Sequence, residues 1–167
     1  MTVDNKIYVI GPAGSGKTTF AMGMARRQNI PYFSLDDIKW INDRKFKHYT
    51  HSRSYQERTD AISEIIASNN SWIFDGVYCA DWVNPVFQHA DEIIFLDTPL
   101  FICQWRCIKR FIKTYNSQTS SFKALLDLLK WNQSYKSKYL TQIRQKVDLF
   151  NKKYCVVSYT KGNTYGL

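Results

Sequence analysis

The chain has 167 residues, 44% of them hydrophobic and 22% charged, which is the composition of an ordinary globular domain. Its length allows a core that needs no disulfide, and no apolar run approaches the ~18 residues of a membrane-spanning helix. The net charge of +9 excludes a surface that is acidic overall.

The positive charge is concentrated in the second part of the chain. Residues from 101 onward include thirteen Lys and Arg but only two acids, whereas residues 1–100 include ten basic and twelve acidic residues. The basic part therefore either faces an anionic partner or remains solvated.

Four cysteines without a C-x-x-C pair predict reduced, buried thiols rather than a metal site. The first apolar segment begins close to the N-terminus and leaves no room for a signal peptide. We therefore expect a cytoplasmic protein with no membrane partner.

A glycine-rich loop follows the first apolar run, residues 7–10. Gly11 to Thr18 read GPAGSGKT and fit G-x-x-x-x-G-K-[ST], the Walker A pattern. Its glycines let the backbone turn tightly and direct successive N–H groups at one phosphate chain, and the helix that follows adds a partial positive charge. We expect the Lys17 ammonium to contact the outer phosphates and the Thr18 hydroxyl to bind Mg²⁺. The predicted nucleotide-binding residues are Gly11, Pro12, Ala13, Gly14, Ser15, Gly16, Lys17, Thr18 and Thr19.

Four further apolar segments are typical of strands, and helical patterns alternate with them. These strands are expected at residues 32–35, 72–76, 92–97 and 155–157. The alternation predicts an α/β fold with a parallel sheet and right-handed crossovers. Because ligands bind at the carboxyl ends of strands in such sheets, Asp36 and Asp37 are expected beside the glycine-rich loop. Asp97 is the next acid at a strand end. A role in the site and capping of the following helix are equally good interpretations of this residue.

Residues 39–53 show no clean period and mix cations with aromatic side chains, so we predict a mobile excursion rather than a core element. Ser54 then begins S-Y-Q-E, a capping box in which Glu57 reaches back to the start of a helix. The expected apolar face of that helix is formed by Ala61, Ile62, Ile65 and Ile66.

The helix predicted at residues 100–114 has two opposed stripes. The apolar stripe, expected in the core, is Phe101, Trp105, Ile108 and Ile112. The cationic stripe is Arg106, Lys109, Arg110 and Lys113. It is either a solvent face or a phosphate clamp, and composition alone favours the solvent face.

The remaining segments are polar or amphipathic. Residues 116–121 are typical of a flexible connector of lid type, and the tail at 160–167 is predicted to be loop or disordered. The stretch 122–149 is amphipathic, with an apolar face that includes Phe122, Leu125, Leu126 and Leu129.

Several motifs carry a resemblance to a known group of proteins. They are GPAGSGKTTFA at the glycine-rich loop, YFSLDDIKW at 32–40, WIFDGVY at 72–78, IFLDTP at 94–99 and WRCIKRFIK at 105–113. Together they resemble the nucleoside-monophosphate and shikimate kinase superfamily. The nearest resemblance is to the bacterial adenylate-kinase-related topology modulation proteins of the FlaR type. The match thins beyond about residue 130.

The resemblance implies a three-layer P-loop NTPase fold with a five-stranded parallel sheet in the order 2-3-1-4-5, flanked by helices. It implies a single domain over residues 1–167, with an acceptor-binding excursion at about 36–68 and a lid at about 106–124. ATP, or another NTP, and Mg²⁺ are the implied cofactors.

The resemblance also implies roles for particular residues. In this superfamily two arginines one turn apart close on the nucleotide, so Arg106 and Arg110 become candidates for stabilising transition-state charge. Asp75 matches an acid that orients Mg²⁺, and Asp36 matches an acid that contacts substrate or metal. The candidate catalytic residues are Lys17, Arg106, Arg110, Asp36 and Asp75, and the candidate metal-binding residues are Thr18 and Asp75.

One departure from the superfamily concerns the acceptor. Nucleotide kinases usually carry an Arg a few residues after the D-G of the third strand, and residues 75–85 contain none. Either Arg44, Arg53 or Arg58 substitutes for it, or the acceptor is not a nucleoside monophosphate.

We therefore expect an ATP- and Mg²⁺-dependent phosphotransferase whose partner is a small phosphate acceptor. Two alternatives stay open. One is a nucleotide-dependent regulator that binds nucleic acid through the basic part of the chain and its interleaved aromatic side chains. The other is an NTP-binding switch with weak hydrolysis.

Overall fold

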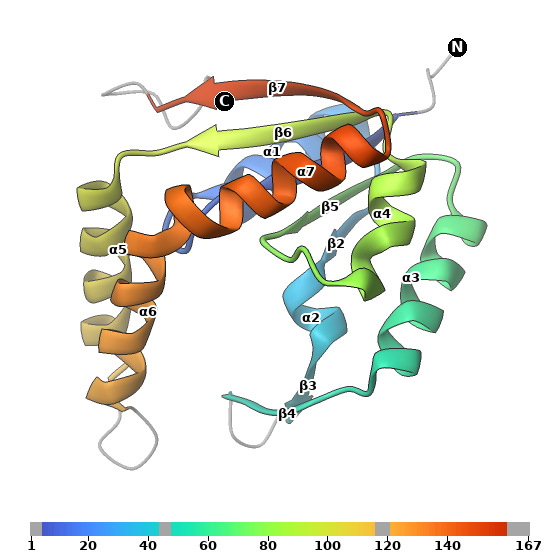
Figure 1. Cartoon of the computed structure of the whole chain (residues 1–167). Coiled ribbons are helices and arrows are strands. Elements are labelled where there is room, and N and C mark those ends of the chain that lie inside the picture. Colours follow the sequence, from blue (N-terminus) through green and yellow to red (C-terminus); the bar gives the residue numbers. More distant parts are fainter. Residues whose placement is uncertain (1–4, 44–47, 116–120, 160–167) are drawn as a thin grey trace.

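The computed structural model describes residues 5–43, 48–115 and 121–159. A five-stranded parallel sheet lies at its centre, in the spatial order β2-β5-β1-β6-β7 (Figure 1). Counted within this sheet alone, the order is 2-3-1-4-5, as predicted; the labels differ because an additional hairpin, β3–β4, follows β2. The strands of the sheet are β1 (Lys6–Ile10), β2 (Tyr32–Ser34), β5 (Trp72–Gly76), β6 (Glu92–Asp97) and β7 (Lys153–Ser158).

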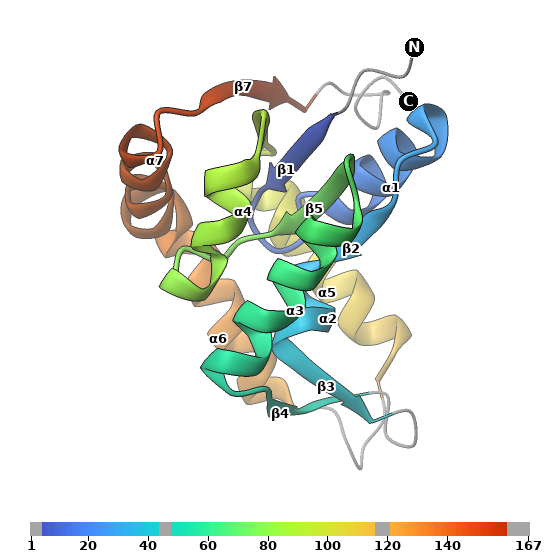
Figure 2. The ribbon, with the colours of Figure 1, turned by 90° about the vertical axis from the view of Figure 1, so that its right-hand side faces the viewer.

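Helices cover both faces of the sheet, which confirms the predicted three layers. Figure 2 shows α1 and α7 on opposite sides of the strands. Because successive side chains of a strand point to opposite faces, β1 contributes Val9 to the core under α1 and Tyr8 to the core under α3, α4 and α7. These helices are α1 (Lys17–Gln28), α3 (Tyr55–Ser68), α4 (Asn84–His89) and α7 (Leu140–Leu149).

Helix α3 forms as the sequence predicts. The Ser54 N–H donates to the Glu57 carboxylate (2.7 Å) and the Glu57 N–H donates to the Ser54 hydroxyl (3.3 Å), which completes the capping box. Ile62 is fully buried, and Ala61, Ile65 and Ile66 pack against the same core.

The prediction of an excursion at residues 39–53 did not foresee the regular elements that this segment contains. A short helix, α2 (Leu35–Lys39), leads into an antiparallel hairpin of β3 (Trp40–Asp43) and β4 (His48–Ser52). The register shifts between Ile41 and Asn42, and this irregularity interrupts the alternation by which a strand is recognised. Arg53 fixes the base of the hairpin, because its guanidinium donates to the carbonyl oxygens of Asp37 (2.6 Å), Ile38 (2.9 Å) and Trp40 (3.1 Å).

The prediction that the apolar stripe of the next long helix enters the core is wrong. Helices α5 (Leu100–Lys113) and α6 (Phe122–Ser134) stand side by side and extend away from the sheet (Figure 1). The side chains of Phe101, Trp105 and Ile112 are 71%, 56% and 67% exposed, and Ile108 is half-buried. The small side chains of Cys103 and Cys107 form the buried face of α5 instead.

The structure differs from the predicted apolar face of the stretch 122–149 at two positions. Phe122 and Leu126 of the predicted apolar face are exposed. After α6 the chain passes through a π-helical segment, Tyr135–Tyr139, before α7. Residues 116–120 of the predicted lid connector and the tail at 160–167 lie outside the described residues.

All four cysteines are free, and burial raises the pKa of the Cys103 thiol to about 11, so this thiol stays protonated. Cys103 and Cys107 are buried, whereas Cys79 and Cys155 are partly exposed. Within the described ranges, no helix is both long and apolar enough to cross a membrane.

Candidate active site

The glycine-rich loop connects β1 to α1 and turns at two glycines in the left-handed conformation. Gly14 and Gly16 have positive φ angles of 79° and 93°, a region that side chains disfavour. A Cβ atom on Gly14 would lie 2.3 Å from the carbonyl oxygen of Cys103, so only glycine fits against α5. Lys17 is the first residue of α1, which places its charge and the helix N-terminus at the same end of the loop.

Two neighbouring elements hold this loop in place. The Thr98 hydroxyl, just after β6, donates to the carbonyl oxygen of Ser15 (3.0 Å). The buried amide of Asn132 in α6 accepts from the Ala13 N–H (3.1 Å) and donates to the Ala13 carbonyl (3.0 Å). The loop is therefore held by contacts from the end of β6 and from α6.

Asp75 lies at the end of β5 beside the loop and is only 1% exposed. Its carboxylate accepts hydrogen bonds from the hydroxyls of Thr18 (2.7 Å) and Tyr32 (2.9 Å). Burial raises the pKa of Asp75 and the nearby charge of Asp36 adds to this, whereas the two hydrogen bonds and the Lys17 charge act in the opposite direction. Mg²⁺ prefers oxygen ligands such as carboxylates and hydroxyls. Asp75 and Thr18 therefore fit the predicted metal.

Asp36, in the first turn of α2, belongs to a group of polar and aromatic side chains that we call the acceptor cluster: Asp36, Lys39 and Tyr78. The Tyr78 hydroxyl donates to the Asp36 carboxylate (2.5 Å). The Lys39 ammonium lies 4.7 Å from the centre of the Tyr78 ring and 4.7 Å from that of Trp40. Partial burial and the charge of Arg58 lower the pKa of Lys39, and Asp36 opposes this. The cluster thus places a cation near Asp36, and the charge of Asp36 in turn acts on Asp75.

The two candidate lid arginines differ in position. The Arg106 guanidinium donates to the carbonyl oxygens of Gly14 (3.3 Å) and Ser15 (3.1 Å) and lies 5.3 Å from the centre of the Tyr159 ring. Arg110 is exposed one turn further along α5, and its guanidinium makes no hydrogen bond or ion pair to any residue that the structure describes. The structure brings only Arg106 onto the loop.

The three arginines considered for the acceptor phosphate also differ. Arg53 donates to three backbone carbonyls of its own hairpin, as described above. Arg58 donates to the Arg53 carbonyl (2.7 Å) and to the Ser52 hydroxyl (2.6 Å), and lies 5.5 Å from the centre of the Trp82 ring. Arg44 lies outside the described residues. Both arginines that the structure describes are therefore engaged in structural contacts.

Sequence reasoning overlooked several residues of this site. Tyr32 and Tyr78 lie inside the motifs at 32–40 and 72–78, but a tyrosine near a strand end carries no distinctive spacing. Asn132 lies 119 residues from Ala13, and no local pattern links them. Asp97 does not cap α5, because its carboxylate pairs with the Lys136 ammonium (2.8 Å) and Pro99 occupies the N-cap position.

We predict that Asp75→Asn increases the free energy of unfolding of the nucleotide-free protein at neutral pH. A carboxyl whose pKa is raised by folding contributes its stabilisation below the unfolded-state pKa, and this is lost as the pH rises through the raised value. The gain from Asn should therefore shrink as the pH is lowered, which urea unfolding at several pH values would measure. Asp127→Asn, on exposed α6, is the matched control and should show no such gain. A variant at Asp75 that is less stable than wild type at neutral pH would contradict the electrostatic argument.

Comparisons with known proteins bear on the fold of the chain. No family model and no curated protein matches the chain. Among solved structures, a gluconokinase from Sinorhizobium meliloti 1021 is similar with a TM-score of 0.57 and 15% identity, over 96% of this chain and 86% of that one. A shikimate kinase from Bacteroides thetaiotaomicron gives 0.58 and 19%, over 92% and 86%. A shikimate kinase from Acinetobacter baumannii in complex with shikimate gives 0.57 and 17%, over 96% and 87%. At these identities the likeness concerns the fold, and the chain has the α/β fold of these small-molecule kinases.

Proposed function

We propose that the chain is an ATP- and Mg²⁺-dependent phosphotransferase whose acceptor is a small hydroxylated molecule. One observation carries the proposal. The glycine-rich loop, the buried Asp75 bonded to Thr18, and the acceptor cluster lie together at the carboxyl edge of one parallel sheet. Phosphoryl transfer needs a phosphate cradle, a metal position and a group that orients the acceptor at one place.

The donor side of the site would use residues that are already positioned. The loop N–H groups and Lys17 would hold the phosphates of ATP, and Thr18 and Asp75 would hold Mg²⁺. When bound, the metal neutralises charge on the phosphate oxygens. Arg106 would add positive charge beside the loop, where preorganised charge lowers the barrier most.

The acceptor side of the site would use Asp36. The Tyr78 hydroxyl orients the Asp36 carboxylate. This carboxylate could accept a hydrogen bond from a substrate hydroxyl and act as the general base that removes the hydroxyl proton. Arg53 and Arg58 are the two described candidates for holding an acceptor phosphate, and both donate to the protein itself instead. We therefore favour a hydroxylated acceptor without a phosphate, in line with the small molecules for which the similar structures are named.

We predict that ADP release from ATP and Mg²⁺ rises with neutral polyols or hydroxy acids and not with nucleoside monophosphates. Asp36→Asn should lower the acceptor-stimulated rate by ~10²–10⁴-fold, because a positioned general base contributes about that much. The matched control is Asp37→Asn, an exposed neighbour in the same turn, which should stay within about threefold of wild type. No stimulation by any acceptor, with ATP still bound, would contradict the proposal and favour an NTP-binding switch.

A second candidate function is supported by the outer face of α5. The exposed Trp105 ring lies 5.0 Å from the Lys109 ammonium, and Phe101, Arg110 and Lys113 are exposed on the same helix. Exposed rings next to cations suit single-stranded nucleic acid, whose bases stack while its phosphates attract positive charge. Under this proposal α5 would contact a single strand.

For this second candidate we predict that a fluorescent single-stranded oligonucleotide binds at low salt and weakens as salt rises. Trp105→Ala should cost ~1–3 kcal/mol of binding free energy, measured by fluorescence anisotropy, because one stacking platform is lost. Tyr55→Ala, which removes an exposed ring from α3, is the control. Absence of binding at low salt, or equal losses in both variants, would exclude α5 as a nucleic-acid surface.

A further inference from the structure

A cavity of about 340 Å³ lies over β6 and the edge strand β7. Its apolar lining includes Phe95 and Val156. Phe95 belongs to the core under α7, whereas Cys155 and Val157 pack toward α1, so strand alternation turns Val156 to the α7 face. Tyr159, on which Arg106 lies, packs on the α1 side. The cavity therefore opens on the face of the sheet opposite to that ring.

Tyr135 is the most informative residue of this cavity. It lines the cavity and is only 5% exposed. Its hydroxyl makes no hydrogen bond to any residue in the described part of the chain. Burial raises the pKa of this hydroxyl, so it remains a hydrogen-bond donor at neutral pH. A ligand oxygen in the cavity could therefore accept a hydrogen bond from this hydroxyl.

The rim of the cavity is positively charged. The Arg144 guanidinium lines it and has no hydrogen bond or ion pair to any residue that the structure describes. Lys136 also lines the rim and pairs with Asp97. These two side chains are 64% and 46% exposed, and ion pairs this exposed contribute little to stability. Two cations against one acid favour an anionic ligand.

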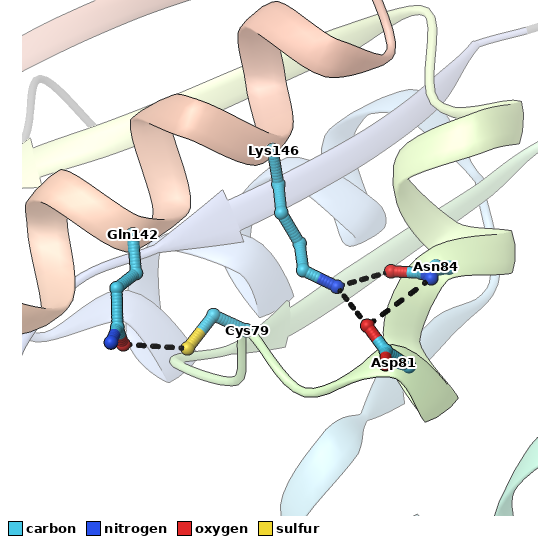
Figure 3. Close-up of polar contacts among 5 residues, drawn as sticks. All are labelled: Cys79, Asp81, Asn84, Gln142 and Lys146. Atoms are coloured by element: carbon cyan, nitrogen blue, oxygen red, sulfur yellow. Dashed lines mark hydrogen bonds and ion pairs between the residues drawn. The ribbon is translucent and has the colours of Figure 1, made fainter.

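The wall that carries these groups is firmly held. Figure 3 shows α7 joined to the segment after β5 by polar contacts. The Lys146 ammonium lies 2.8 Å from the Asp81 carboxylate and also donates to the Asn84 side chain, and the Cys79 thiol donates to the Gln142 side chain (3.4 Å). The π-helical segment Tyr135–Tyr139 precedes this wall, and such segments occur frequently at functional sites.

We propose that this cavity binds a small organic anion whose apolar body lies against Phe95, Leu140 and Val156. The anionic oxygens would accept hydrogen bonds from the Arg144 guanidinium and the Tyr135 hydroxyl. A planar guanidinium matches a carboxylate or a phosphate ester with two parallel hydrogen bonds. A volume of about 340 Å³ is the size of pocket that a small metabolite occupies. Pro12 of the glycine-rich loop also lines the cavity, so the site adjoins the proposed phosphotransferase centre, but the proposal does not depend on that function.

Direct binding without nucleotide or acceptor tests the proposal. The probes are 3-phenylpropionate, its uncharged analogue 3-phenylpropanol, phenyl phosphate and inorganic phosphate, each followed by ligand-observed NMR titration. We expect 3-phenylpropionate or phenyl phosphate to bind at least ~10-fold more tightly than both 3-phenylpropanol and inorganic phosphate, because charge and apolar contact are both needed. The tighter of the two anions identifies the ligand as a carboxylate or a phosphate ester.

Two variants localise the binding. Arg144→Gln and Tyr135→Phe should each weaken the tighter anion by ~10-fold, because each removes one hydrogen-bonding partner. The matched control is Arg27→Gln, which removes an exposed cation from α1 and should leave the affinity unchanged. Equal binding of 3-phenylpropionate and 3-phenylpropanol, no saturable binding of any probe, or equal losses in Arg144→Gln and Arg27→Gln would overturn the proposal. Because no nucleotide is present, these outcomes are independent of the phosphotransferase assay.

Discussion

The hydrogen bond between the Thr18 hydroxyl and the Asp75 carboxylate is the interaction on which the candidate site depends. It joins the start of α1 to the end of β5, two elements that the chain separates by 57 residues. The parallel register places Asp75 beside Val9, so the carboxylate lies at the level where the glycine-rich loop begins. Burial of this acid is unfavourable, and the two hydroxyls and the Lys17 charge offset part of that cost.

The close approach of α5 to the loop explains the unusual exposure of that helix. Gly14 touches the backbone of Cys103, and Asn132 of α6 contacts both Ala13 and the Cys107 thiol. Only small side chains fit on the face of α5 that lies there. Its larger apolar side chains consequently face outward, and Arg106 is brought onto the loop carbonyls. One packing constraint thus accounts for both a site residue and an exposed surface.

The regular core of this fold could be predicted from sequence because its signals are local. The apolar run of Trp72, Ile73 and Phe74 marks β5 as an interior parallel strand, and Ser54 with Glu57 marks the start of α3. The glycine-rich loop is recognised by its spacing. In each case the residues that carry the signal are neighbours in the chain.

The features that were missed depend on contacts between distant segments. The stripe of α5 that contains Trp105 is amphipathic, yet periodicity reveals only that a face is apolar and not what covers it. The β3–β4 hairpin is fixed by the Arg53 side chain and broken by an irregular register. The support of the loop by Asn132 links residues from opposite ends of the sequence. No alternation or spacing rule encodes such pairs.

The most direct test of the central claim is the Mg²⁺ dependence of ATP binding, measured by isothermal titration with Mg²⁺ and with a chelator. The wild-type protein should bind ATP at least ~10-fold more tightly with Mg²⁺. Thr18→Val, of nearly equal size, should lose that difference because it removes the hydroxyl that joins Asp75 to the loop. Thr141→Val, at an exposed position of α7, should keep it. ATP binding that is independent of Mg²⁺, or a Thr18→Val variant that retains the full effect, would contradict the assignment of this site.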